Sequence, residues 1–360
     1  MAVAAGSLLV GIVPVAQAEL RVGKSYRLAS DPAPFRGKDA TALVANPSNP
    51  QHIVEVNSNY LSQECEYTVS RDGGNTWSTA TAFRPPAPGG GEPFVPTCRA
   101  SDHLADYTFQ TVEFGSGDSV YAVFSTPRRT SAGGEQGSSI LVAKSTDGGS
   151  TFAPAVIVVA GGLTSSTGPY YELPSLAVDP GAGTAGADRV IAAAREVTGS
   201  FEPGGDAMTS VSNDGGLTFS APVQVEPAGE QVAGPDTVSP PVFLPDGSIA
   251  IAWRQQGQTA PIKVARSTDA GQTWGPPVET AIATNTGSNF NTNPPQPRPA
   301  TGSSFPRLAV NDVTGTLYLV YNQGPAAPGA PPQGFLGADH FISPDSDVYL
   351  QRSLTQGATW

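Results

Sequence analysis

The chain has 360 residues, with 41 glycines, 35 prolines and a net charge of −12 at pH 7. Only 14% of the residues are charged, against roughly 25% in an average soluble domain, so the surface must rely on uncharged polar side chains. The acidic balance leaves no basic surface for a nucleic-acid backbone, which excludes nucleic acid as a partner. The length is compatible with two domains or with one long all-β domain, and either can bury a large core.

The amino-terminal segment predicts export. Residues 2–16 are almost wholly apolar, and Ala16-Gln17-Ala18 is a small-x-small pattern typical of signal cleavage. We therefore expect a signal peptide over residues 1–18 and a secreted protein, extracellular or periplasmic. No basic residue precedes Arg21, so a buried strand is the alternative interpretation. No other segment reaches the length needed to cross a membrane, and no membrane insertion is expected.

The chain contains two cysteines, Cys65 and Cys98, which fit one disulfide in an exported protein. They stand 33 positions apart, and closing such a loop stabilises a fold by about 3 kcal/mol in the chain-entropy model. Two separate buried thiols or one reactive thiol are the alternatives. The three histidines carry no signature that would pair one of them with a catalytic cysteine.

An eight-residue pattern, Ser-x-Asp-x-Gly-x-Thr followed by Trp or Phe, recurs along the chain. The copies lie at residues 70–77, 145–152, 212–219 and 267–274, with a degenerate fifth at 353–360. Ser and Asp oxygens bond nearby backbone N–H groups and Gly allows a positive φ, so each box predicts a hairpin turn. We expect the closing aromatic residues, Trp77, Phe152, Phe219 and Trp274, to be largely buried between neighbouring sheets.

A second repeat precedes each box and consists of two apolar strands joined by a turn. The predicted strand pairs are 41–45 with 52–56, 112–114 with 120–124, 176–178 with 190–193, 241–244 with 249–253, and 308–310 with 317–321. A third strand should end at the serine of the box and a fourth should follow the box. Four antiparallel strands recurring every 55–86 residues are typical of the blades of a β-propeller. No stretch with a helical period appears.

The box resembles the Asp-box, or BNR repeat, of the sialidase (neuraminidase) superfamily, and residues 36–360 resemble its six-bladed propeller. The resemblance implies an all-β propeller and an exo-sialidase-like glycoside hydrolase that acts on carboxylated glycans. Five blades are visible, so we expect a single domain over residues 19–360 that lacks its carboxyl-terminal part, or a ring closed by the segment near Leu20–Leu28. The same boxes occur in proteins that are not sialidases, so they indicate fold better than function.

Propellers bind substrate where first strands begin and second strands end, and arginines gather there. The six arginines are Arg36, Arg128, Arg129, Arg195, Arg254 and Arg307. Arginine forks bind carboxylates in a bidentate manner, which suits an acidic sugar. The resemblance assigns substrate binding to Arg36, Arg254 and Arg307. The alternative interpretation is that each arginine pairs with a neighbouring acidic residue.

The catalytic set that the resemblance implies is incomplete. The family uses an Asp acid and a Tyr nucleophile activated by a Glu, and this Tyr is expected beyond Trp360. Glu172 and Asp236 are the candidates for a catalytic carboxylate. No zinc spacing or phosphate-binding loop is present, so neither a metal nor a cofactor is expected. The alternatives are a catalytically degenerate propeller that binds glycan or protein, and another secreted glycosidase on the same scaffold. In each case we expect a monomer.

Overall fold

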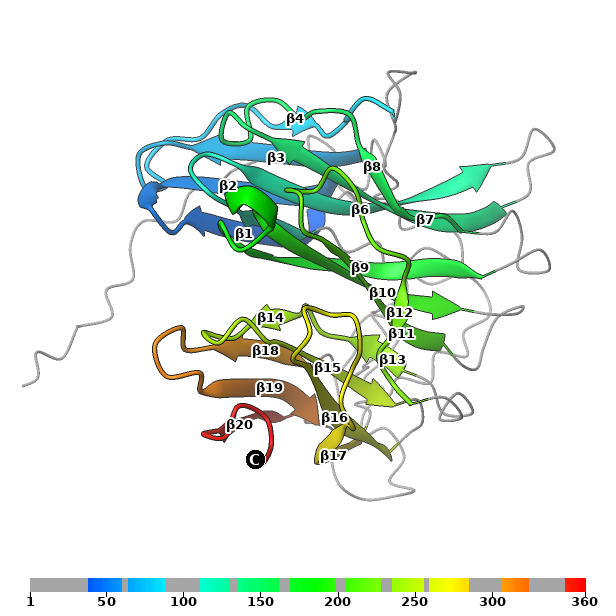
Figure 1. The fold of residues 1–360 in the computed structure, drawn as a ribbon. Coiled ribbons are helices and arrows are strands. Elements are labelled where there is room, and N and C mark those ends of the chain that lie inside the picture. Colours follow the sequence, from blue (N-terminus) through cyan, green and yellow to red (C-terminus); the bar gives the residue numbers. More distant parts are fainter. Residues whose placement is uncertain are drawn as a thin grey trace, which may run out of the picture.

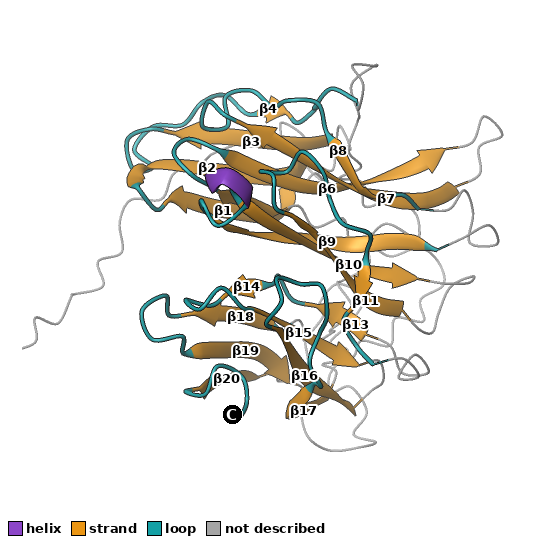
Figure 2. Ribbon diagram, viewed as in Figure 1, coloured by secondary structure: helices purple, strands orange, loops and turns teal. Residues whose placement is uncertain are grey.

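The protein is a five-bladed, all-β propeller. The structure, a computed structural model, describes residues 38–59, 64–87, 111–129, 135–161, 169–197, 205–227, 235–255, 259–284, 306–323 and 347–360. Five antiparallel sheets follow one another in chain order, and Figure 1 views them from the side. The helix in Figure 2 is a single 3-10 turn, η1 (Thr184–Gly186). Within the described residues no helix is long and apolar enough to cross a membrane.

The blades are numbered one to five along the chain. Blades one and two contain β1 (Lys38–Asn46), β2 (Asn49–Asn59), β3 (Glu64–Ser70), β4 (Thr81–Ala82), β5 (Thr111–Phe114), β6 (Val120–Arg129), β7 (Glu135–Ser145) and β8 (Val156–Val159). Blade three contains β9 (Tyr170–Asp179), β10 (Arg189–Val197), β11 (Gly205–Ser212) and β12 (Val223–Gln224). Blades four and five contain β13 (Pro235–Val238), β14 (Val242–Phe243), β15 (Ile249–Gln255), β16 (Thr259–Ser267), β17 (Val278–Thr284), β18 (Arg307–Val310), β19 (Leu317–Gln323) and β20 (Asp347–Ser353).

The strand order confirms the prediction made from the two repeats. The predicted strand pairs form the first two strands of blades one, two, three and five, and the third strand of every blade ends at the serine of a box. Blades one to four have a fourth strand after the box, whereas blade five has three strands in the described part of the chain. Because the repeat specifies both the strands and the turns between them, local sequence is sufficient to define this architecture.

Blade four departs from the expected pattern in its first strand. The prediction placed that strand at 241–244, but the structure splits it into β13 and β14, which both pair with β15. Pro240 and Pro241 lie in the gap, and proline has no N–H to donate to a ladder. Ser239 bridges the break, because its N–H donates to the Ala252 carbonyl at 2.8 Å and its Oγ accepts the Ala252 N–H at 2.9 Å.

The blades pack face to face through apolar seams. Between blades two and three, Tyr121 and Ile140 pack against Tyr171, Leu176 and Val190, all buried. Comparable clusters fill the seams on either side, and the one between blades three and four centres on Trp253, which is 0% exposed. Burying a large aromatic side chain contributes about 3 kcal/mol, so these seams hold the blades together.

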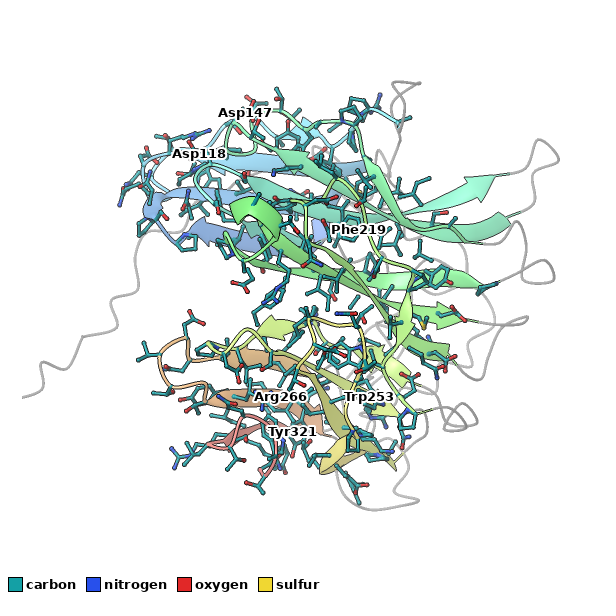
Figure 3. All side chains as sticks on the ribbon, in the orientation of Figure 1. Asp118, Asp147, Phe219, Trp253, Arg266 and Tyr321 are labelled. Atoms are coloured by element: carbon teal, nitrogen blue, oxygen red, sulfur yellow. The ribbon has the colours of Figure 1, made fainter. Side chains whose placement is uncertain are left out.

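Strand pairing defines two opposite edges of the propeller. The box edge carries the five boxes, because each box serine pairs with the start of a second strand, as Ser145 does with Val120. The rim edge lies at the other end of the strands, where first strands begin and second strands end, as Pro235 pairs with Gln255. Figure 3 labels Asp118 and Asp147 at the box edge, on the left. The described binding candidates Arg254 and Arg307 therefore belong to the rim edge.

The boxes share one hydrogen-bond pattern, shown here for box four. The Ser267 hydroxyl donates to Asp269 at 2.8 Å and accepts the Gly271 N–H at 2.8 Å. Asp269 in turn accepts the backbone N–H of Thr273 at 2.9 Å and its hydroxyl at 2.5 Å. These bonds from Thr273 lower the pKa of Asp269 to about 2. Boxes one, two and three repeat the same four bonds.

The fifth box keeps this geometry although a threonine replaces the aspartate. Thr355 Oγ1 accepts the N–H of Thr359 at 2.8 Å and lies 2.8 Å from the Thr359 hydroxyl. The Gly357 N–H donates to Ser353 at 2.8 Å, as in the other boxes. A hydroxyl oxygen can therefore take the structural place of the carboxylate in this turn.

The closing aromatic side chains are largely buried, as predicted, and each keeps a minor part of its surface exposed. Their place between neighbouring sheets is confirmed for two of them. Phe152 packs on Tyr67 and Phe83 of blade one, with ring centroids 5.5 and 4.9 Å apart, and Trp274 donates to Thr209 of blade three at 3.1 Å. Each ring lies across the edge of a seam, so part of its surface stays in solvent.

A buried carboxylate ties blade two to blade three at the box edge. Asp188 is 3% exposed and accepts the Tyr121 hydroxyl at 2.8 Å, the Ser116 hydroxyl at 2.6 Å and the N–H groups of Ser116 and Gly181 at 3.0 and 3.1 Å. Burial alone would raise the pKa of Asp188, but these four donors lower it. Hydrogen bonds from both blades therefore stabilise the negative charge of Asp188.

Candidate functional site

The predicted site residues differ in how much of them the structure describes. Arg36, a predicted binding residue, lies outside the described residues. Glu172 lies in β9 and Asp236 in β13, at a register shift between Pro235 and Thr237, but their side chains are not described. Their proposed catalytic roles therefore stay predictions. Arg254 and Arg307 are described in full.

Arg254 is buried at the rim end of blade four. It lies in β15, is 0% exposed, and its guanidinium donates to the carbonyls of Gln255 at 3.1 Å and Ala283 at 3.3 Å. Its neighbour Trp253 points to the opposite face of the sheet and packs in the seam towards blade three. In this arrangement the Arg254 guanidinium donates hydrogen bonds to backbone carbonyls at the ends of β15 and β17. Because the side chain is fully buried, other protein atoms separate its charge from solvent at the rim.

Arg307 is the first residue of β18 and is exposed at the rim edge of blade five. Protein atoms packed around its side chain nevertheless lower the pKa of the guanidinium through desolvation. Further along this end of the blade, Tyr321 stacks on Tyr349, with centroids 5.5 Å apart and planes at 13°. Because Arg307 pairs with Val320 and the buried Tyr321 belongs to the alternate face of the sheet, the arginine and this tyrosine pair lie on opposite faces of blade five.

Blade three holds a tyrosine–carboxylate pair at the rim edge. Tyr171 of β9 and Glu196 of β10 are register partners, and the Tyr171 hydroxyl donates to Glu196 Oε2 at 2.7 Å. Tyr171 is 4% exposed, and burial followed by this hydrogen bond raises its pKa. No motif in the sequence indicated that these two residues bond each other. A register shift between Ala193 and Arg195 brings Glu196 opposite Tyr171, so extending the predicted strand pair along the sequence would not have found this pair.

Two further carboxyls have raised pKa values that the sequence did not indicate. Glu226, 4% exposed at the end of blade three, accepts the Ala207 N–H at 2.9 and 3.0 Å, and burial raises its pKa. Glu113 of β5 has its pKa raised to about 7 by burial. Perturbed carboxyls are enriched at functional sites, and Glu226 lies at the rim edge.

Cys65 lies in β3 and is 1% exposed, packed against Phe83 and Phe124. It is not a free thiol in the described part of the chain. Cys98 lies outside the described residues, so a bridge between the two cysteines stays a prediction. Within the described ranges no three His, Cys, Asp or Glu side chains gather closely enough to hold a metal ion.

No family model and no curated protein matches the chain. Among solved structures, the fold is similar to a Hadza microbial sialidase, with 17% identity, a TM-score of 0.45 and coverage of 87% of this chain and 55% of that one. The NanB sialidase of Streptococcus pneumoniae gives 10% identity, a TM-score of 0.44 and coverage of 85% and 59%. The GH93 α-L-arabinofuranosidase of Fusarium graminearum gives 13% identity, a TM-score of 0.45 and coverage of 78% of this chain and 87% of that one. The chain thus spans little more than half of the two sialidases. At these values the likenesses carry no argument about its chemistry.

Proposed function

We propose that this protein is an exported, sialidase-like glycoside-hydrolase propeller that binds carboxylated glycans at its rim edge. The observation that carries the proposal is the position of Arg254 and Arg307 at the same edge of the adjacent blades four and five, opposite the boxes. Arg307 is the exposed charge that a sugar carboxylate would meet first. Arg254, and Arg36 ahead of blade one, complete the proposed binding set.

The hydrolytic step needs a group that stabilises positive charge at the anomeric carbon. The Tyr171 hydroxyl donates a hydrogen bond to Glu196, so Glu196 can take the phenol proton as the phenol oxygen bonds to the anomeric carbon and the glycosidic bond to the leaving group breaks. Glu172, which follows Tyr171 in β9, and Asp236 in blade four are the remaining candidate carboxylates. These assignments are proposals that rest on position along the rim edge.

A second candidate function is binding without turnover. It is favoured by the burial of Tyr171 and Arg254, at 4% and 0% exposure, because a sugar cannot reach a nucleophile that the protein covers. In that case Arg307 is the arginine, within the described residues, through which the rim recognises glycan.

Calorimetry with free sialic acid tests the binding half. We expect Arg307→Ala to weaken binding by about 1.5–3 kcal/mol, the contribution of a hydrogen bond to a charged group. Arg352→Ala is the matched control, since Arg352 is also exposed on blade five but lies next to the box serine. Equal affinity for sialic acid and for a neutral hexose would refute the arginine assignment.

Release of a fluorogenic sialoside tests the hydrolytic half, with a fluorogenic arabinofuranoside as the probe for the alternative glycosidase. We expect Tyr171→Phe to abolish sialoside release while free sialic acid still binds. Binding without any turnover in the parent protein would establish the second candidate. Turnover that survives Tyr171→Phe would remove this pair from the mechanism.

A further inference from the structure

The face of blade three that packs towards blade two carries a row of four titratable side chains at its rim end. Tyr171 of β9 is the register partner of Glu196 in β10, and Glu196 is the register partner of Asp206 in β11. Glu226, two residues after β12, lies next to Asp206, because a side-chain hydrogen bond joins the two carboxyls. Register partners in adjacent strands point to the same face, with Cβ atoms about 5 Å apart. We call these four residues the blade-three row.

The hydrogen bond between Glu226 and Asp206 requires a proton. Glu226 accepts the Ala207 N–H at 2.9 and 3.0 Å, and Asp206 accepts the Gln224 side-chain amide at 3.2 Å. Two ionised carboxylates are acceptors only and repel each other, whereas a protonated carboxyl has a hydroxyl to donate and an oxygen that still accepts. One proton therefore lies between these two groups.

Burial assigns this proton to Glu226. Its side chain is 4% exposed, whereas Asp206 is half-buried and also receives the Gln224 amide. Removing a charge from water is costly, so the more deeply buried of two neighbouring carboxyls is the one that stays neutral. Burial is accordingly the largest cause of the raised pKa of Glu226; its backbone hydrogen bonds lower that pKa, and the neighbouring Asp206 raises it again.

Other charged groups near the row face elsewhere or carry no described side chain. Arg195 pairs with Ala207, whose side chain packs towards blade four, so Arg195 points to the opposite face of the sheet. On the blade-two side this face meets Ile140, Val158 and Val159, which have no charge. The charged residues at the rim ends of β6 and β7, whose side chains are not described, are Arg128, Arg129 and Glu135. Asp206 is thus the charged partner of Glu226 on this face.

We propose that Glu226 is protonated at neutral pH and, together with Asp206, is a positioning residue for the Tyr171–Glu196 pair. The Glu226 hydroxyl donates to Asp206, and because this neutral carboxyl adds no charge to the row, Glu196 stays the acceptor of the Tyr171 hydroxyl. At alkaline pH the Glu226 proton passes to solvent and a further negative charge enters the row, so Tyr171 releases its own proton less readily. The positioning role rests on the proposed hydrolytic function, whereas the protonation of Glu226 does not.

The pH dependence of unfolding of the full chain tests the protonation. An unfolded chain releases this proton near pH 4.5, whereas the folded protein keeps it to higher pH, so the parent loses stability as the pH rises. Glu226→Gln has a neutral amide at every pH, so between pH 5 and pH 9 its melting temperature should fall by about 5 °C less than that of the parent. Glu279→Gln is the matched control and should follow the parent, since Glu279 is an exposed carboxyl in the fourth strand of blade four.

A second variant and a second measurement make the test independent of how well Glu226→Gln folds. Asp206→Asn alters a half-buried position and leaves Glu226 in place, and it should lose part of the pH dependence of the parent because Asp206 no longer opposes the ionisation of Glu226. Infrared absorption by protonated carboxyls at pH 7 should decrease by one group in Glu226→Gln and stay unchanged in Glu279→Gln.

Release of a fluorogenic sialoside tests the positioning role. We expect turnover by the parent to fall by about tenfold between pH 7 and pH 9, and turnover by Glu226→Gln to persist at pH 9. A parent without turnover at any pH would refute the proposed hydrolysis and the positioning role with it, while unfolding and infrared absorption still decide the protonation of Glu226.

Two outcomes would overturn the protonation and leave the proposed function intact. One is the same pH dependence of unfolding, with the same infrared absorption at pH 7, in the parent and in a folded Glu226→Gln. The other, decisive if Glu226→Gln does not fold, is equal pH dependence of unfolding in the parent and in Asp206→Asn.

Discussion

The two edges of the propeller use polar side chains in opposite ways. At the box edge the same few polar residues repeat five times, and their hydrogen bonds stay inside the turn or reach the preceding blade. At the rim edge no two blades are alike: blade three has Tyr171–Glu196, blade four has the buried Arg254, and blade five has the exposed Arg307. Repetition marks what each blade needs to fold, whereas the irregular positions are the ones available for ligand recognition.

This contrast predicts that box-edge substitutions act on stability and that rim substitutions act on binding. The largest expected effect is at Asp188. Asp188→Ala leaves the Tyr121 hydroxyl and the Ser116 and Gly181 N–H groups without their shared acceptor, so we expect a loss of about 3–5 kcal/mol. Chemical denaturation measures it.

Asp118→Ala is the control for that experiment, since Asp118 lies at the same edge but 59% of its side chain is exposed. Arg307→Ala at the rim should change the unfolding free energy by less than about 0.5 kcal/mol. A loss below about 1 kcal/mol in Asp188→Ala, or a large loss in Arg307→Ala, would break the contrast between the edges.

The next effect is at the closing aromatic of box two. Phe152→Ala removes edge-to-face contacts with Tyr67 and Phe83, and because part of the ring stays exposed we expect a loss of about 2–3 kcal/mol, at the low end for an aromatic truncation. Phe152→Leu should lose less than half as much. Thermal unfolding of both variants and the parent, with and without ligand, measures these losses. If Phe152→Ala kept its stability but lost ligand binding, our assignment of Phe152 to the structural box edge would be wrong.

A smaller effect on stability, which depends on pH, should distinguish box four, with its aspartate, from box five, with its threonine. Asp269→Thr should cost about 1 kcal/mol at pH 7, similar to loss of a helix cap, because a neutral hydroxyl replaces a charged acceptor. The folded pKa of Asp269, about 2, is below its usual 3.8, so its contribution is complete above pH 4 and disappears as the pH falls towards 2. The parent and the variant should therefore converge in stability near pH 2.

Thr355→Asp is the reciprocal change and should gain stability at pH 7 and lose that gain over the same pH range. Denaturation of both variants at pH 7, 4 and 2.5 gives the result. A stability difference between Asp269→Thr and the parent that does not depend on pH would show that the carboxylate is not the acceptor that matters in this turn.

The smallest effect concerns backbone strain within the boxes. Boxes one to three have two glycines at positive φ, but box four has Ala270 at φ 61° and box five has Gln356 at φ 53°. A left-handed conformation costs a residue with a Cβ about 1 kcal/mol, partly offset by the entropy of glycine, so Ala270→Gly should stabilise by about 0.5 kcal/mol. Gln356→Gly should do the same. Destabilisation by both in thermal unfolding would contradict this account.

The sequence by itself determined the blades. Ser, Asp, Gly and Thr at fixed spacing act within eight residues, so the boxes, the ends of the third strands and the apolar strand pairs could all be predicted without distant contacts. The interruption of the first strand of blade four also has a local cause, Pro240 and Pro241.

Tertiary structure decided which side chains meet across strands and seams. Asp188 and Tyr121 are 67 residues apart and Tyr171 and Glu196 are 25 apart, so neither bond has a local pattern. The burial of Arg254 follows from the carbonyls at the ends of β15 and β17, which only the packed blade brings to its guanidinium. Short-range turn chemistry is encoded residue by residue, whereas burial and pairing between blades arise only when the chain has folded, because they depend on groups distant in sequence.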